Sequence, residues 1–225
     1  MRPQSDTSGR RARRDRPLPR RFYARPPVAV ARALLGRLLV RDSPRGPRGR
    51  LIGRIVEVEA YGGARDPASH AFRGETARNR TMFGPPGHAY IYLSYGVHHC
   101  LNVVTGSAGR AAAVLIRALE PIAGLDAMAR RRGVRDPKRL TRGPGCVARA
   151  LGLTRTHDGL DLTRGPLWLT DHAPRRQGRR IARSARIGIS RAEARRWRFF
   201  LAGHPCVSGR PAGRPARPGP GPVRR

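Results

Sequence analysis

At 225 residues and 24.8 kDa, the chain is long enough to form one domain with a core that folds unaided. Its 47 basic and 14 acidic residues give a formal net charge of +33, which indicates a polyanionic partner, with nucleic acid as the first candidate. The three cysteines form no CxxC pair and no run of 18 apolar residues exists, which disfavours a disulfide framework, a zinc ribbon and a membrane span.

The two ends of the chain contain too few apolar residues to join a core. Residues 1–21 carry eight arginines, and residues 209–225 are mostly Gly, Pro and Arg. We expect both to be disordered tails that attract phosphates without reading sequence. The folded domain is therefore expected over residues 22–208.

Between the tails, the pattern predicts three helices and a larger number of strands. The first helix is predicted over residues 27–35, with Pro27 at its start and Gly36 after its end; the others are predicted from Pro121 to before Gly133 and over residues 146–151. Strands are predicted over residues 37–40, 51–60, 89–94, 97–104, 112–118, 167–170, 185–190 and 198–202. Because strands outnumber helices and short turns join them, we expect an antiparallel α+β domain.

The segment IVEVEAY, residues 55–61, combines a valine-rich strand with two carboxylates. Alternation along a strand places Ile55, Glu57, Glu59 and Tyr61 on one face, with the two valines and Ala60 on the other. One interpretation is a catalytic carboxylate beside an aromatic wall. The other is a solvated edge strand, or a glutamate paired with one of the many arginines.

The segment AYIYLSYGVHHCLNVV, residues 89–104, holds three of the five tyrosines of the chain. Tyr90 and Tyr92 fall on one strand face, where ordinary packing is an equally good interpretation. Tyr95 and Gly96 lie between two strands and indicate the tip of a hairpin. A ring at such a tip projects into solvent unless a partner receives it, and a stack of bases is a suitable receiver.

Other chemistries have weak support in the sequence. His98, His99 and Cys100 alternate in direction along a strand, so they do not readily share a metal ion. The chain lacks GxSxG, GxxxxGK[ST] and a GxGxxG followed by a suitable helix. Its one lysine, Lys138, is predicted in a solvated loop, which disfavours a Schiff base. Without covalent chemistry, Glu59 could supply an activated water.

From about Phe22 to Ser208, the chain resembles the alkyladenine (3-methyladenine) DNA glycosylases of the mammalian type. The resemblance is carried by ARALLGRLLVR, GRIVEVEAYGGARDPASHA, RNRTMFGPPGHAYIYLSYGVHHCLNVVT, VLIRALEP, RGPGCVARALGL and RIGIS. It implies a single α+β domain with a curved antiparallel sheet, a protruding β-hairpin and flanking helices. It also implies a monofunctional enzyme that flips alkylated or deaminated purines out of duplex DNA and hydrolyses their N-glycosidic bonds, as in base excision repair.

The resemblance further implies roles for individual residues. Glu59 corresponds to the general base that deprotonates the attacking water, and Arg117 to a basic residue near that water and the phosphate of the target. Tyr95 corresponds to the residue that intercalates into the duplex. The residues corresponding to the pocket for the extruded base are Tyr61, His70, Tyr92 and Asn102, of which Asn102 is the one that disfavours guanine.

The resemblance also implies no cofactor and no metal, with double-stranded DNA that contains damaged purines as the partner. We further expect a monomer. The scattered cysteines and the missing apolar run predict no membrane contact and a cytoplasmic location, where the basic chain would be nucleoid-associated. Two departures from the family pattern affect local contacts. Cys146 replaces a lysine while Arg142 is gained, and Cys206 stands where an aromatic residue is expected. The alternative function is a non-enzymatic, sequence-independent nucleic-acid binder that uses its tyrosines as stacking platforms.

Overall fold

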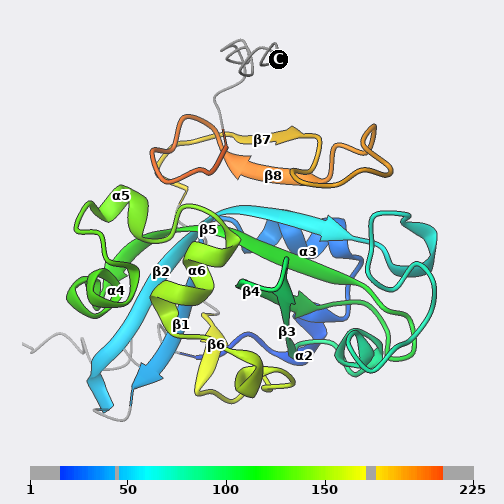
Figure 1. Cartoon of the computed structure of the whole chain (residues 1–225), viewed down its shortest axis with the longest axis horizontal. Helices are drawn as coiled ribbons and strands as arrows, with labels where there is room; N and C mark the ends of the chain where they lie inside the picture. Colours follow the sequence, from blue (N-terminus) through cyan, green and yellow to red (C-terminus); the bar gives the residue numbers. More distant parts are fainter. Residues whose placement is uncertain (1–15, 44–45, 171–175, 210–225) are drawn as a thin grey trace, which may run out of the picture.

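The computed structural model describes residues 16–43, 46–170 and 176–209. Its helices and strands are labelled in Figure 1. In chain order they are α2 (Arg20–Tyr23), α3 (Pro27–Leu34), β1 (Leu38–Ser43), β2 (Gly46–Tyr61), the 3-10 helices η1 (Gly63–Arg65) and η2 (Arg80–Phe83), β3 (Ala89–Ser94), β4 (His98–Val104), β5 (Ala113–Ala123), α4 (Leu125–Arg132), α5 (Pro137–Leu140), α6 (Pro144–Leu151), the 3-10 helix η3 (Arg155–His157), β6 (Leu167–Leu169), β7 (Ile181–Ser184) and β8 (Arg198–Leu201).

One curved antiparallel sheet organises the described residues, as expected for an α+β domain (Figure 1). Its main path runs β3-β4-β5-β2-β1-β6, and β8 joins through β2 and carries β7 on its far side. The long strand β2 therefore has β5 along one edge, while β1 and β8 share the other. This central position explains why both faces of β2 are buried from Ile55 to Ala60.

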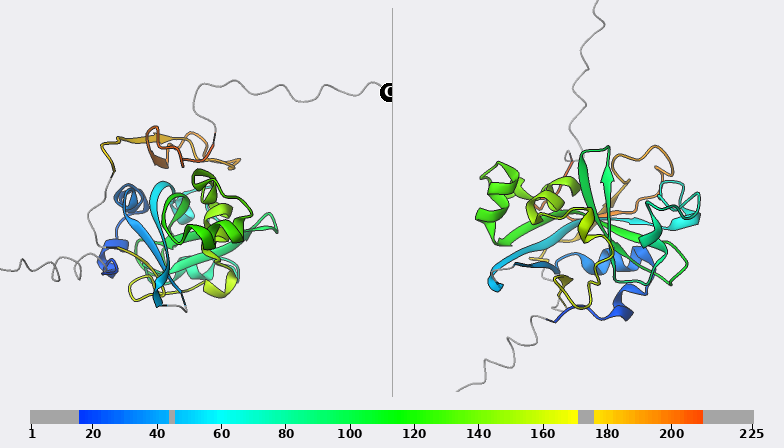
Figure 2. Two further views of the ribbon diagram at one scale, coloured as in Figure 1. Left: turned by 90° about the vertical axis from the view of Figure 1, so that its left-hand side faces the viewer. Right: turned by 60° about the horizontal axis from the view of Figure 1, so that its bottom comes forward.

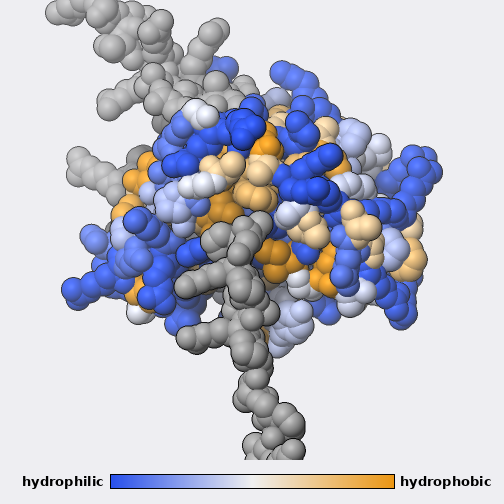
Figure 3. Space-filling view, turned by 90° about the horizontal axis from the view of Figure 1, so that it is seen from above, coloured by the Kyte–Doolittle hydropathy of each residue, from blue (hydrophilic) through white to orange (hydrophobic). Residues whose placement is uncertain are grey.

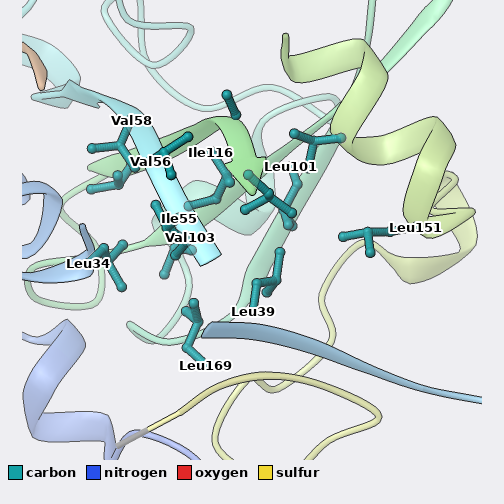
Figure 4. Close-up of a cluster of buried hydrophobic side chains, with 14 of the residues drawn as sticks. Leu34, Leu39, Ile55, Val56, Val58, Leu101, Val103, Ile116, Leu151 and Leu169 are labelled. Carbon is teal, nitrogen blue, oxygen red and sulfur yellow. The ribbon is translucent and has the colours of Figure 1, made fainter. Parts of the chain in front are cut away.

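The apolar core lies where the sheet meets helices α3 and α6. Side chains from several strands and both helices converge there (Figure 4). Val56, Val58 and Ile116 are fully buried at its centre, with Leu101 from β4 and Leu151 from α6. Burying each such side chain contributes about 1.5–3 kcal/mol, so this cluster is the main stabilising element of the domain.

The ladder between β2 and β5 is irregular beside the two glutamates. Ile55 pairs with Leu119 and Glu57 with the next residue, Ala118, so the register skips Val56 on β2. Val58 then pairs with Ile116, so the register skips Arg117 on β5. Such irregularities re-aim side chains and are frequent next to active sites. Ile55 packs in the apolar core with Val56, so the predicted alternation is wrong at Ile55.

Several predicted elements differ from the observed ones; the strand predicted over residues 51–60, for example, is β2 and runs from Gly46 to Tyr61. The helix predicted from Pro121 begins at Leu125, because β5 continues to Ala123 and Gly124 turns the chain with φ +76°. The strand predicted over residues 185–190 is absent, and β7 ends earlier, at Ser184. Lys138 lies in the short helix α5 and not in a loop.

The folded domain includes part of the predicted N-terminal tail. Leu18 is buried, its N–H donates to the carbonyl of Leu169 at 2.8 Å, and Arg20 forms an ion pair with Asp161 at 2.6 Å. Residues 16–21 therefore belong to the domain, and the predicted boundary at residue 22 is wrong. Residues 1–15 and 210–225 of the predicted tails lie outside the described residues.

The face of the molecule over β7 and β8 is rich in hydrophilic side chains (Figure 3). Seen from above, it has smaller apolar areas between the charged side chains (Figure 3). Across the residues that the structure describes, no helix has the length and apolar character needed to cross a membrane.

Candidate active site

Glu59 lies near the end of β2 and is fully buried. One carboxylate oxygen, Oε2, accepts hydrogen bonds from the Tyr61 hydroxyl at 2.9 Å and from Nη1 of Arg117 at 3.2 Å. The other oxygen, Oε1, accepts from the backbone N–H of Ile187 at 2.7 Å. A buried carboxylate requires such partners, because loss of hydration is otherwise too costly.

The two side-chain donors stay protonated. Burial raises the pKa of Tyr61, and the negative charge of Glu59 raises it further. Burial alone would lower the pKa of Arg117, but the carboxylates of Glu59 and Glu57 outweigh it, so the pKa lies above its ordinary value. Glu59 is therefore surrounded by groups that donate hydrogen bonds at any physiological pH.

A cavity of about 730 Å³ opens beside this carboxylate. Glu59 itself does not line it, but all three residues that donate to Glu59 do. The carboxylate thus lies directly behind the cavity wall. Of the seven predicted site residues, the six that line the cavity are Tyr61, His70, Tyr92, Tyr95, Asn102 and Arg117.

Aromatic rings form one side of the cavity. His70 meets Tyr92 edge to face, with ring centroids 4.4 Å apart, and Tyr90 stacks on Tyr92 at 5.5 Å. Tyr90 is buried and its hydroxyl lies 3.2 Å from Nδ1 of His70. Burial, with a contribution from Arg78, lowers the pKa of His70, so the imidazole is neutral at pH 7. These contacts fix rings that could receive a flat ligand.

Asn102 faces the same cavity from β4, opposite Tyr90 in β3. It is buried, and its Nδ2 donates to the backbone carbonyl of Tyr90 at 3.2 Å. This bond holds the amide in place. A side chain must be fixed in this way if it is to select among ligands by their shape.

Tyr95 occupies the tip of the β3–β4 hairpin, as the sequence predicted. Tyr95 and Gly96 both have positive φ, +48° and +70°, and the N–H of Val97 donates to the carbonyl of Ser94. Two such residues in a row form the turn that matches the twist of a hairpin. The Tyr95 side chain is 85% exposed, and the hairpin projects beyond the body of the molecule (Figure 2).

An ion pair that the sequence analysis missed holds the cavity wall. Arg186 is fully buried and donates to both carboxylate oxygens of Asp66, at 2.5 and 2.8 Å. Its guanidinium lies 4.7 Å from the centre of the Tyr61 ring. Beside this pair the chain has left β7, which ends at Ser184, and the N–H of Ile187 reaches Glu59. The RIGIS motif was the only local signal for this segment.

The departures from the expected pattern have structural roles. Cys206 is buried in the apolar core, where it takes the place expected for an aromatic ring. Arg142 donates from Nε to the carbonyl of Val207 at 2.8 Å and so holds the returning C-terminal segment. Cys146 lies half-buried in the first turn of α6. In the described ranges, no group of three or more His, Cys, Asp or Glu residues is placed to hold a metal ion.

Comparison with known proteins identifies the type of chemistry. The sequence profile described as methylpurine-DNA glycosylase (MPG) matches residues 21–205. A protein of Methanoculleus marisnigri is 50% identical over 86% of this chain and 99% of its own length. Proteins of Chlorobaculum tepidum and Streptomyces avermitilis are 46% and 47% identical over 91% and 85% of this chain, and over 93% and 91% of their own lengths. All three are provisionally named 3-methyladenine DNA glycosylase.

The fold, the cavity and these relatives define a DNA glycosylase, a hydrolase of the N-glycosidic bond that joins a base to its sugar. The chain belongs to the methylpurine-DNA glycosylase family and acts in the repair of damaged DNA. The alternative of a non-enzymatic nucleic-acid binder is therefore set aside. The individual roles of the seven site residues stay predictions at this point.

Proposed function

We propose that this glycosylase flips a damaged purine out of duplex DNA into the aromatic cavity and hydrolyses its N-glycosidic bond, with Glu59 as the general base. The observation that supports this most strongly is the position of the Glu59 carboxylate, one hydrogen bond away from three groups of the cavity wall. An ionised carboxylate has about four acceptor sites, and these three donors leave one for a water molecule.

In the proposed reaction, the water oxygen bonds to C1′ of the flipped nucleotide while Glu59 takes a proton from that water. The bond between C1′ and the base breaks, and its electron pair leaves with the base. In 3-methyladenine the base is cationic, so departure neutralises it and needs little acid assistance. Glu59 also stabilises the positive charge that develops on the sugar.

The pocket supports selection for such bases. A cationic purine between Tyr61, Tyr92 and His70 gains about 0.5–2 kcal/mol of cation–π attraction over a neutral one. We propose that deaminated purines such as hypoxanthine are also accepted, by stacking alone, and that Asn102 crowds the exocyclic amine of normal guanine. Arg117 would stand near the water and the phosphate of the target.

Flipping leaves a gap in the base stack. The exposed Tyr95 ring at the hairpin tip is suited to fill it, which would offset part of the few kcal/mol that extrusion costs. We also propose that the enzyme acts as a monomer. The large positive charge supports an enzyme that stays associated with chromosomal DNA.

A panel of duplexes, each with one lesion, tests the proposal. The wild-type enzyme should release hypoxanthine and ethenoadenine from single-lesion duplexes, and 3-methyladenine and 7-methylguanine from methylated DNA. Glu59→Gln should reduce release by about 100-fold or more while binding stays nearly intact. Glu75→Gln, which changes an exposed carboxylate that pairs with Arg80 and does not line the cavity, is the matched control.

Unchanged turnover in Glu59→Gln would contradict the proposed base. Release of methylated purines without hypoxanthine would restrict the substrates to alkylated bases. Flipping is measured by the fluorescence of 2-aminopurine next to the lesion, which should rise on binding as the stack opens. A constant signal would contradict extrusion.

A further inference from the structure

A second carboxylate, Glu57, lies two residues before Glu59 on β2 and is fully buried. Its Oε1 accepts hydrogen bonds from Nε of Arg117 at 3.0 Å, Nε of Arg198 at 2.7 Å and Oγ of Ser208 at 2.9 Å. Its Oε2 accepts from the N–H of Ser208 at 2.5 Å. Four donors surround this carboxylate, and neither Glu57 nor its partners Arg198 and Ser208 line the cavity, so Glu57 does not face a substrate.

Arg117 connects this carboxylate to the proposed base. Its Nε donates to Glu57, its Nη1 to Glu59 at 3.2 Å, and its Nη2 to the Ser208 hydroxyl at 3.4 Å. The guanidinium is planar and rigid, so two of its nitrogens determine where the third points. Glu57 and Ser208 therefore direct Nη1 at Glu59. The irregular register at Arg117 places its side chain within reach of both carboxylates.

The charges around Glu59 balance. Glu57 and Glu59 contribute two negative charges, and Arg117 from β5 and Arg198 from β8 contribute two positive ones. Tyr61 faces Glu59 as a neutral hydroxyl. From the segment after β7, Arg186 lies nearby but is neutralised by Asp66. The negative charge of Glu57 thus neutralises one of the two arginines. Without Glu57, both positive charges would act on the carboxylate of Glu59.

We propose that Glu57 is a positioning residue of the glycosylase reaction, which orients Arg117 toward Glu59 and supplies the negative charge that balances the second arginine of the cluster. This role rests on the proposed function of Glu59 as the base. Glu57 itself touches neither the water nor the base. Its effect is electrostatic and geometric, and it is transmitted through Arg117.

The role predicts pH effects of opposite sign for two variants. Glu57→Gln keeps an acceptor oxygen for the arginines but leaves the cluster with one excess positive charge. The acid limb of the single-turnover rate profile should then move to lower pH, by about one unit, and the plateau rate should fall about 10-fold. Arg198→Gln leaves one excess negative charge and should move the acid limb to higher pH by a similar amount.

The experiment measures single-turnover release of hypoxanthine or methylated purines between pH 4 and 9, together with DNA affinity, for wild type and both variants. Glu120→Gln is the matched control, because Glu120 pairs with Arg54 on the same sheet but does not contact this cluster. Its acid limb should match that of the wild type. Binding should change less than about 3-fold in Glu57→Gln, since the proposed effect is on the chemical step.

Opposite shifts of the two acid limbs support the proposal. Unshifted limbs, or limbs that move in the same direction, overturn it, even if both variants lose activity through reduced stability. If Glu57→Gln does not fold, Arg198→Gln decides alone by the presence or absence of its upward shift. An inactive wild-type enzyme would instead contradict the proposed function, so the two failures are distinguishable.

Discussion

Replacing Asp66 by alanine should destabilise the domain strongly, because it leaves the guanidinium of Arg186 buried without a counter-charge. Both side chains of the pair are fully inaccessible to solvent. Removing one partner of a buried ion pair costs about 3–5 kcal/mol. The change also removes the acceptor for the N–H groups of Gly62 and Ala68, at 3.0 and 3.3 Å.

We therefore expect a loss of about 4 kcal/mol, against a total stability of about 5–15 kcal/mol for a domain of this kind. With an m-value of about 2 kcal/mol per M, the urea midpoint falls by about 2 M. Trp197 lies 5.6 Å from the Arg186 guanidinium, so its fluorescence reports the loss locally. The control is Glu75→Ala, which breaks an exposed pair with Arg80 and should cost no more than about 1 kcal/mol.

The same pair makes stability depend on pH. Burial alone would raise the pKa of Asp66, but hydrogen bonds from Arg186 and from the N–H of Gly62 outweigh it and hold the pKa below its ordinary value of 3.8. A depressed pKa in the folded state gives stability that is present above pH 4 and is lost as the pH falls through the folded value. The difference between wild type and Asp66→Ala should shrink below pH 4. A loss under 1 kcal/mol at pH 7, or a difference that is constant with pH, would refute this reasoning.

Two further predictions concern the hairpin tip and the thiols. Tyr95→Asn should keep the turn, because Asn tolerates positive φ. It should weaken binding to lesion DNA about 5- to 100-fold, which is the cost of losing one stacked ring. Equal losses of affinity for undamaged duplex, measured by competition, would contradict the proposed intercalation. Native protein at pH 8 should take up one equivalent of a thiol reagent, at the half-buried Cys146, and three equivalents after unfolding. Burial shields Cys100 and Cys206 and raises the pKa of both thiols, that of Cys206 to about 11, so rapid uptake of more than one equivalent in the native state would contradict the buried positions.

Much of the fold follows from local pattern. The bounds of β3 match the prediction over residues 89–94, and helices α3 and α6 lie within two residues of theirs. These segments have strong apolar periodicity and clear Pro or Gly signals at their ends. The start of the helix predicted from Pro121 was wrong because strand β5 continues past this proline, where it still pairs with β2.

The arrangement of the site depends on contacts that no local pattern contains. Glu57 was recognised as a companion of Glu59, but its partners Arg198 and Ser208 follow 141 and 151 residues later in the chain. With 46 arginines in the sequence, nothing local distinguishes Arg186 or Arg198 from those at the surface. Their ion pairs with Asp66 and Glu57 form only in the folded domain, where β8 pairs with β2 and brings the C-terminal segment beside it.

The contact between Glu57 and Ser208 has a consequence for biosynthesis. The cluster that orients Arg117 needs residues from the first third of the chain and from the last turn that the structure describes. A nascent polypeptide that has exposed only its amino-terminal part can form strands β1 and β2 but has no Ser208 to close on Glu57. We therefore expect competence to release damaged bases to arise late in translation, when the carboxyl-terminal segment has left the ribosome and docked.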